Sequence, residues 1–143
     1  MANLLESARV AGRFTQFLEL AKQTGMDVAL QSTGPLTLFA PNDEAMAKLS
    51  ARTIETISGN SKTLMDLVKY HVLDGRYTSV DLEGLSTSTT LQGEDVEIRV
   101  DEGVLKIDGA HVVRADITAD NGVIHSIDTV LVPESAALTM QSQ

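Results

Sequence analysis

The spacing of apolar residues changes near residue 75, and this change limits the folds that the chain can adopt. Before it, apolar residues recur with a helical period, as in "RFTQFLELAKQTG" at 13–25. After it, apolar and polar residues alternate, as in "VEIRV" at 96–100. Strands joined by short turns must be antiparallel, because a parallel crossover needs about a dozen residues or more. The sequence therefore predicts an α+β fold with helices first and a sheet after them.

The first half contains further helix signals and one extended run. Asn3 and Asn42 are each followed by acidic residues, as expected of residues that cap a helix. "PLTLFAP" at 35–41 is predicted to be extended, and "TIETI" at 53–57 to add a short helical turn. The strongest helical signal is "SKTLMDLVKYHVL" at 61–73.

The second half is predicted to form a series of short strands. Three tight turns separate them: Asp101-Glu102-Gly103, Asp108-Gly109 and Asn121-Gly122. The Ser/Thr-rich run at 86–90 suits either a flexible loop or an edge strand, and 134–143 is expected to be a frayed tail. Because no repeat or linker interrupts the sequence, residues 1–143 are expected to form one domain.

Charge is unevenly distributed along the chain, whose formal net charge is −9. Residues 1–71 hold seven basic and seven acidic residues, whereas residues 72–143 hold four basic and thirteen acidic ones. This sign excludes nucleic acid as a natural partner, since phosphate binding needs basic residues. The acidic residues are expected on turns and solvent-facing strand positions, although a basic protein patch or loosely held divalent cations are alternatives.

The composition excludes some kinds of chemistry but leaves the cellular compartment open. The chain has no cysteine, which excludes disulfides, thiolate metal sites and cysteine nucleophiles. No apolar run approaches the roughly 18 residues of a membrane span. "MANLLESARV" at the start lacks the features of a secretion leader. The protein is therefore expected either to stay inside the cell or to be a mature form whose leader has been removed.

The three histidines are the main candidates for chemistry. His71 falls on the apolar stripe of the predicted 61–73 helix, and His125 lies in a strand that is apolar on both faces. Both are expected to be structural, that is, buried with a hydrogen-bond partner. Ser126 and Asp128 lie on the opposite face of the strand from His125, so no Ser–His–Asp relay is available within it.

No motif indicates a cofactor or a metal. The three histidines show no short ligand spacing, the acidic turns do not match a Ca²⁺ loop, and no nucleotide-binding or G-x-S-x-G motif is present. We therefore predict no catalytic residue, no cofactor and no metal ligand, and a protein that is not an enzyme.

Tyr70 is expected to differ from His71. Helical geometry turns it about 100° away from His71, to the edge of the polar side of the 61–73 helix. The ring is therefore expected to keep exposed area and to be available to a partner.

Several segments together resemble a fasciclin-like domain, as found in a single-domain bacterial member. The resemblance covers about residues 4–133 and is carried by these segments: "TLFAPNDEAM" (37–46), "YHVLDGRYTS" (70–79), "LQGEDVEIRV" (91–100), "IDGAHVVRADI" (107–117) and "ADNGVIHSIDTVLVP" (119–133). It implies a wedge of about seven strands flanked by N-terminal helices. It also implies a monomeric, non-enzymatic adhesion module that binds a cell-surface or matrix protein or glycan, at an extracellular, periplasmic or cell-surface location.

The resemblance also implies partner-binding residues. In animal members, integrin binding is assigned to a Tyr-His motif, matched here by Tyr70 and His71, and to an Asp-Ile pair, matched by Asp116 and Ile117. The residues flanking Asp116 and Ile117 depart from the family pattern. Two other functions stay open: a hydrolase or lyase that uses Ser, His and Asp from distant segments, and a small-ligand carrier with a pocket between helices and sheet. Either would need a deep cleft with converging polar groups, which an adhesive domain can lack.

Overall fold

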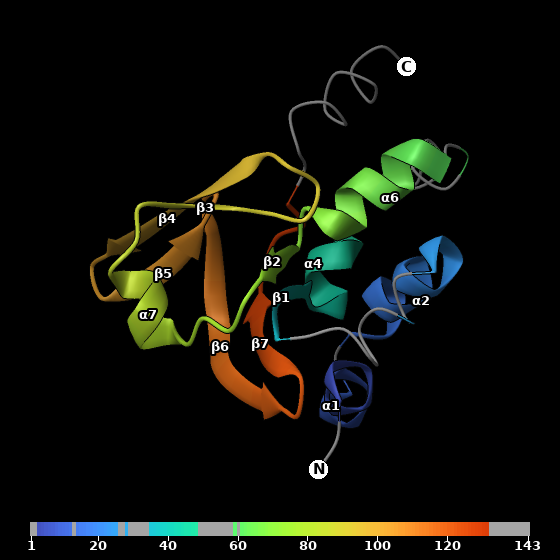
Figure 1. The fold of residues 1–143 in the computed structure, drawn as a ribbon, viewed down its shortest axis with the longest axis horizontal. Coiled ribbons are helices and arrows are strands. Elements are labelled where there is room, and N and C mark those ends of the chain that lie inside the picture. Colours follow the sequence, from blue (N-terminus) through green and yellow to red (C-terminus); the bar gives the residue numbers. More distant parts are fainter. Residues whose placement is uncertain are drawn as a thin grey trace.

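The computed structural model describes residues 3–12, 14–25, 28, 35–48, 59 and 61–131. Its helices are α1 (Leu4–Ala11), α2 (Thr15–Thr24), α4 (Asp43–Ala47), α6 (Ser61–Lys69) and α7 (Ser79–Glu83). Its strands are β1 (Leu36–Pro41), β2 (Val72–Asp74), β3 (Thr87–Thr89), β4 (Asp95–Asp101), β5 (Val104–Ile107), β6 (Ala110–Ala119) and β7 (Gly122–Ile127). In Figure 1, α1, α2, α4 and α6 gather beside β1 and β7, whereas α7 lies at the opposite end, near β4 and β5.

All seven strands belong to one sheet, in the order β2-β1-β7-β6-β5-β4-β3. The strands joined by short turns are antiparallel, as predicted, and β1 pairs in parallel with β7. The run at 86–90 supplies the edge strand β3. A bridge between Leu73 of β2 and Thr90, just after β3, brings the two edges of the sheet together. The sheet is therefore curled almost into a barrel, and the α+β prediction with about seven strands and flanking helices is confirmed.

Gly122 allows β7 to lie close to β1. It pairs with Leu36, and a Cβ atom added at Gly122 would lie 1.9 Å from the Leu36 carbonyl oxygen. No other residue fits at this position without moving the backbone. The glycine of the Asn121-Gly122 turn thus permits the central parallel pair of the sheet.

The predicted helix caps are confirmed. The Asn3 side-chain oxygen accepts from the Glu6 N–H at 2.9 Å, and the Asn42 oxygen accepts from the Ala45 N–H at 2.7 Å. Residues 53–57 and 134–143 lie outside the described residues. Within the described part of the chain, no helix is long and apolar enough to cross a membrane.

The prediction of one helix over 61–73 is wrong at its C-terminal end. Helix α6 ends at Lys69, and residues 72–74 instead form β2, which pairs with β1. The "YHVL" run is apolar enough for either structure, because a short buried run cannot be assigned to helix or strand by periodicity alone. Pairing with β1, which is distant in sequence, decides the outcome.

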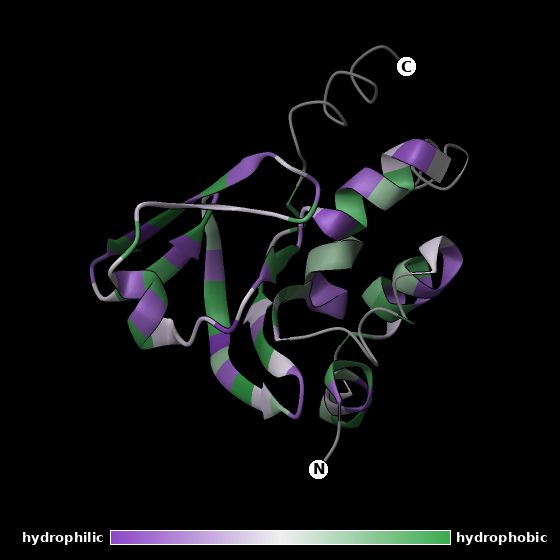
Figure 2. Ribbon diagram, in the orientation of Figure 1, coloured by the Kyte–Doolittle hydropathy of each residue, from purple (hydrophilic) through white to green (hydrophobic). Residues whose placement is uncertain are grey.

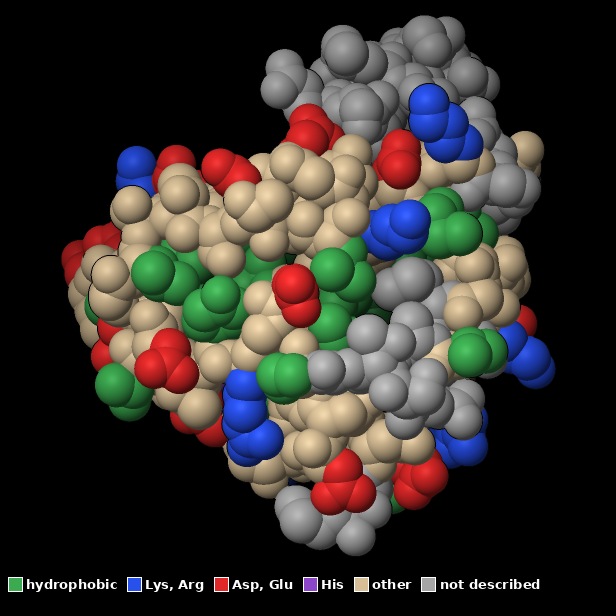
Figure 3. Space-filling model, viewed as in Figure 1, with side chains coloured by type: hydrophobic (Ala, Val, Ile, Leu, Met, Phe, Trp, Pro, Cys, Tyr) green, Lys and Arg blue, Asp and Glu red, His purple; other side chains and the backbone are tan. Residues whose placement is uncertain are grey.

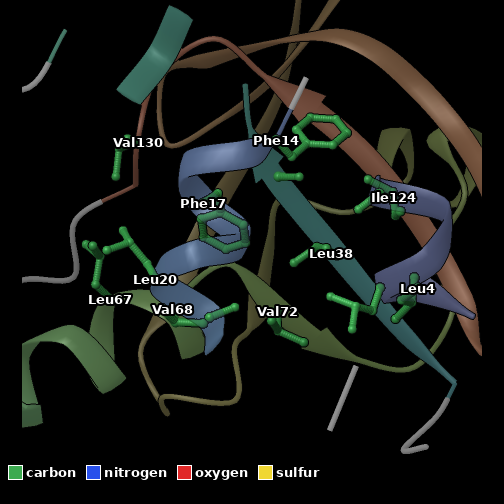
Figure 4. Close-up of a cluster of buried hydrophobic side chains, with 14 of the residues drawn as sticks. Leu4, Phe14, Phe17, Leu20, Leu38, Leu67, Val68, Val72, Ile124 and Val130 are labelled. Carbon is green, nitrogen blue, oxygen red and sulfur yellow. The ribbon is translucent and has the colours of Figure 1, made fainter. Parts of the chain in front are cut away.

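Two hydrophobic clusters fill the structure. The first, here called the helix-side core, packs α1, α2, α4 and α6 against one face of the β1–β7 pair, with Phe14, Phe17 and Leu38 among its members (Figure 4). The second, the sheet-interior core, lies inside the curl of the sheet and includes Phe39 and Ile127.

Strands β1 and β7 are buried at every position because each contributes to both cores. By contrast, β4 alternates between exposed and buried positions along its first half, and Figure 2 shows the matching hydrophilic and hydrophobic bands on the outer strands.

Candidate partner-binding site

His71 is fully buried, two residues after the end of α6. Its Nε2 accepts from the Leu131 N–H at 2.9 Å, so the proton of the neutral ring must reside on Nδ1, which donates to the Leu67 carbonyl at 2.7 Å. Burial lowers the pKa of His71 to about 4, although the Leu67 carbonyl acts in the opposite direction. The ring therefore ties α6 to the segment after β7, and the expectation of a buried, hydrogen-bonded His71 is confirmed.

His125 is also fully buried, with both ring nitrogens occupied. Its Nδ1 accepts from the Asp116 N–H at 3.2 Å, and its Nε2 donates to the Tyr77 carbonyl at 2.8 Å. Burial lowers the pKa of His125, while the Tyr77 carbonyl and the Asp116 carboxylate act to raise it. The ring links β7 to β6 and to the segment before α7, so the same expectation is confirmed for His125.

These hydrogen bonds leave neither buried histidine free to act as a base. His111 is different, because half of its side chain is exposed and its Nδ1 lies 3.8 Å from Asp128 Oδ2. Among the described residues, no three or more His, Cys, Asp or Glu side chains come close enough together to hold a metal ion.

The expectation of an exposed Tyr70 ring is wrong. Tyr70 is only 5% exposed and belongs to the sheet-interior core. Its hydroxyl donates to the Asp108 carboxylate and lies 3.1 Å from the Asp95 carbonyl oxygen. Burial, followed by the hydrogen bond to Asp108, raises the pKa of Tyr70 well above its usual value. The ring is covered because its hydroxyl meets the start of β4, at Asp95, and the β5–β6 turn, at Asp108.

Asp116 is exposed and held in place from both sides. It lies where the register of β6 against β7 shifts, and its backbone has a left-handed φ of +59°. The Ser79 N–H and hydroxyl donate to its carboxylate at 2.8 and 2.6 Å. Partial desolvation acts to raise the pKa of Asp116, but the two bonds from Ser79 outweigh it and the pKa falls below its ordinary value.

Ser79, the partner of Asp116, was not predicted from the sequence. Ser79 is the first residue of α7, whose N-terminus carries a capping box formed by Thr78 and Asp81. The Thr-x-x-Asp spacing at 78–81 was a usable signal for this short helix. Nothing in the sequence indicates that Ser79 meets a residue 37 positions away.

The four residues taken from the family motifs do not form one surface. Tyr70 and His71 are enclosed, and Ile117 is half-buried and packs against the helix-side core. Only Asp116 is exposed. If the family motifs mark a binding surface here, the exposed part of that surface lies at β6.

The acidic residues of the second half lie where they were expected. Of the twelve that the structure describes, ten are exposed, and Glu94 and Asp128 are half-buried. On the face shown in Figure 3, acidic side chains are spread over the surface rather than gathered in one place. Asp81 and Glu83 lie in the short helix α7, and the surface position expected of the others, on turns and outer strand faces, is confirmed.

Comparison with known proteins identifies the family. The fasciclin domain family profile matches residues 12–133, so the chain belongs to the fasciclin family. It is 40% identical over 131 residues to the uncharacterized protein sll1735 of Synechocystis, covering 92% of this chain and 98% of that protein.

Other relatives are longer than the matched region. Human periostin is 40% identical over 109 residues, which are 76% of this chain but 13% of periostin. Immunogenic protein MPB70 of Mycobacterium bovis is 35% identical over 102 residues, 71% of this chain and 52% of that protein. The fold matches a FAS1 domain pair from the insect cell adhesion molecule Fasciclin I with a TM-score of 0.79, at 20% identity and over 94% of this chain and 52% of that one.

Proposed function

We propose that this chain is a non-enzymatic adhesion module that acts as a monomer outside the cytoplasm, where it binds a protein or glycan of a cell surface or matrix. Fasciclin domains occur in cell-adhesion proteins, including the insect molecule whose domain pair has this fold. The occupied ring nitrogens of His71 and His125 also support a role without acid–base catalysis.

The exposed irregularity of β6 at Ala115 and Asp116, where its register against β7 shifts, is the observation that carries this proposal. The Asp116 N–H is bound by buried His125 and its carboxylate by Ser79. A segment that is already ordered loses less conformational entropy when a partner binds. Val80, which follows Ser79 in α7, is 73% exposed and offers apolar surface to a partner. We call Val80, Ala115 and Asp116 the adhesive face.

The charge of the domain indicates the kind of partner. Residues 72–143 hold nine more acidic than basic residues (thirteen against four), and the described ones lie at the surface. A basic partner patch would be attracted to this half of the domain, and salt would weaken the attraction. Attachment is therefore expected to fall as NaCl is raised.

Attachment of cells to the immobilised domain tests the adhesive face. Asp116→Asn removes the charge, keeps an oxygen for Ser79 and tolerates the left-handed backbone. It should weaken attachment, and Val80→Ser should weaken it further. Asp74→Asn and Val104→Ser are the matched controls, because they make the same changes at other exposed positions. Equal losses in variants and controls, or no loss in either, would rule out the adhesive face.

A further inference from the structure

A small cavity lies between the helices and the sheet, on the side of β7 opposite His125. Its volume is about 220 Å³. Its apolar wall includes Phe14 at the start of α2, together with Val113 and Ile117 of β6. Figure 4 shows Phe14 next to Phe17 in the helix-side core. Three polar residues complete the lining: Asn42, Arg114 and Ser126.

The Ser126 side chain is buried, since the residue is only 3% exposed, and its hydroxyl has no hydrogen-bond partner among the described residues. Yet every fully enclosed side-chain nitrogen or oxygen among the described residues has a partner. The Ser126 hydroxyl therefore reaches open space, and the open space that Ser126 lines is this cavity.

Asn42 also contributes a buried polar group to the lining of this cavity. It is 8% exposed, and its side-chain oxygen is occupied by the Ala45 N–H. This bond fixes the orientation of the amide, whose NH₂ group has no partner among the described residues. Asp43, the nearest acid in sequence, directs one carboxylate oxygen to the Gln16 N–H instead.

Arg114 brings a positive charge to the same place. It pairs with Ser126 across β6 and β7, which sets the two Cβ atoms about 5 Å apart. Its side chain is exposed and forms no ion pair with any described residue. Three hydrogen-bond donors thus line this cavity without a partner among the described residues: the guanidinium of Arg114, the hydroxyl of Ser126 and the amide NH₂ of Asn42.

The chemistry of these groups identifies a class of ligand. A guanidinium and an amide NH₂ can only donate hydrogen bonds, and a hydroxyl can donate one. Donors that converge beside an apolar wall favour an anionic head on an apolar body, and a carboxylate suits the planar guanidinium. A cavity of about 150 Å³ can hold benzene, so 220 Å³ has room for a ring with a carboxylate. We propose that this cavity is a binding site for a small apolar carboxylic acid of about the size of benzoate.

Titration of the whole chain with benzoate, followed by NMR of the backbone amides, tests this site. Saturable shifts are expected at Asn42, Arg114 and Ser126. Arg114→Gln should weaken binding at least about tenfold, since it removes a charged donor. Ser126→Ala should weaken it several-fold, and neutral benzamide should bind more weakly than benzoate.

Arg99→Gln is the matched control, because it makes the same change at an exposed arginine of β4 and should leave the affinity unchanged. The site would be ruled out by shifts that never saturate or that spread over the surface. Equal binding of benzamide and benzoate, or equal weakening by Arg99→Gln and Arg114→Gln, would also rule it out. Attachment of cells is not part of this readout, so the result is independent of the adhesive function.

Discussion

The Tyr70–His71 segment and the Asp116–Ile117 segment both match partner-binding motifs of the family, but they occupy different environments. Tyr70 and His71 are 5% and 0% exposed and hydrogen-bond to groups within the fold. Asp116 is exposed at the register shift of β6, and two hydrogen bonds to its carboxylate hold it in place. A family motif can therefore mark residues that support the fold as well as residues that can meet a partner. Only burial distinguishes the two.

The largest expected effect is the loss of the His71 ring. His71→Ala should lower the free energy of unfolding by about 3 kcal/mol or more, because it leaves a cavity and removes the partners of the Leu131 N–H and the Leu67 carbonyl. Urea denaturation measures this. The control His111→Ala, at a half-exposed ring, should change stability by less than about 1 kcal/mol. Similar effects of the two substitutions would contradict a supporting role for His71.

Acid should destabilise the protein through the same ring. The pKa of His71 is about 4 in the folded protein and 6.5 in the unfolded chain. At a pH between these two values, the unfolded chain therefore binds more protons than the folded protein. Stability should therefore fall as pH drops from about 6.5 to 4, by about 3 kcal/mol from His71. His125, whose pKa is also lowered, acts in the same direction.

Urea denaturation at a series of pH values measures this dependence. His71→Gln should make the free energy of unfolding depend less on pH, because it removes the contribution of the His71 ring. A flat stability profile across this range would show that His71 is not buried in its neutral form.

A smaller effect is expected from the Tyr70 hydroxyl. Tyr70→Phe keeps the ring in the sheet-interior core but removes the bond to Asp108 and the contact with the Asp95 carbonyl. The free energy of unfolding should fall by about 1–2 kcal/mol. Thermal denaturation measures the loss, with Tyr77→Phe as the control at a half-buried tyrosine. An unchanged melting temperature for Tyr70→Phe would indicate that the hydroxyl is in solvent.

The smallest effect on stability is expected at the exposed segment. Asp116→Asn should cost less than about 1 kcal/mol, because asparagine tolerates the positive φ and its oxygen still accepts from Ser79. Thermal denaturation of Asp116→Asn, with Asp74→Asn as the control variant, measures this cost. A loss as large as that of His71→Ala would mean that Asp116 is part of the structural framework.

Local patterns in the sequence predicted much of the fold. The alternation in β4, the Asp-Gly and Asn-Gly turns and the caps at Asn3 and Asn42 all act within a few residues, so they could be recognised without a structure. The burial of both histidines followed from the apolar residues around them. That residues 1–143 form one domain stays a prediction.

Features that depend on distant residues could not be predicted. The parallel pairing of β1 with β7, the change from helix to strand after Lys69 and the cover over Tyr70 all arise from segments far apart in sequence. The same is true of the cavity between the helices and the sheet, where Asn42, Arg114 and Ser126 come from three different segments. A pocket between helices and sheet was one of the alternatives that the sequence allows, but the sequence does not indicate which residues line it.

The most direct test of the contrast between the two segments is cell attachment by Tyr70→Phe and Asp116→Asn, measured where both variants are fully folded. Tyr70→Phe should be the less stable protein and still attach as well as the unmodified chain. Asp116→Asn should be nearly as stable as the unmodified chain and attach poorly. Normal attachment by Asp116→Asn together with loss of attachment in folded Tyr70→Phe would contradict the account and place the binding site at the Tyr70–His71 segment.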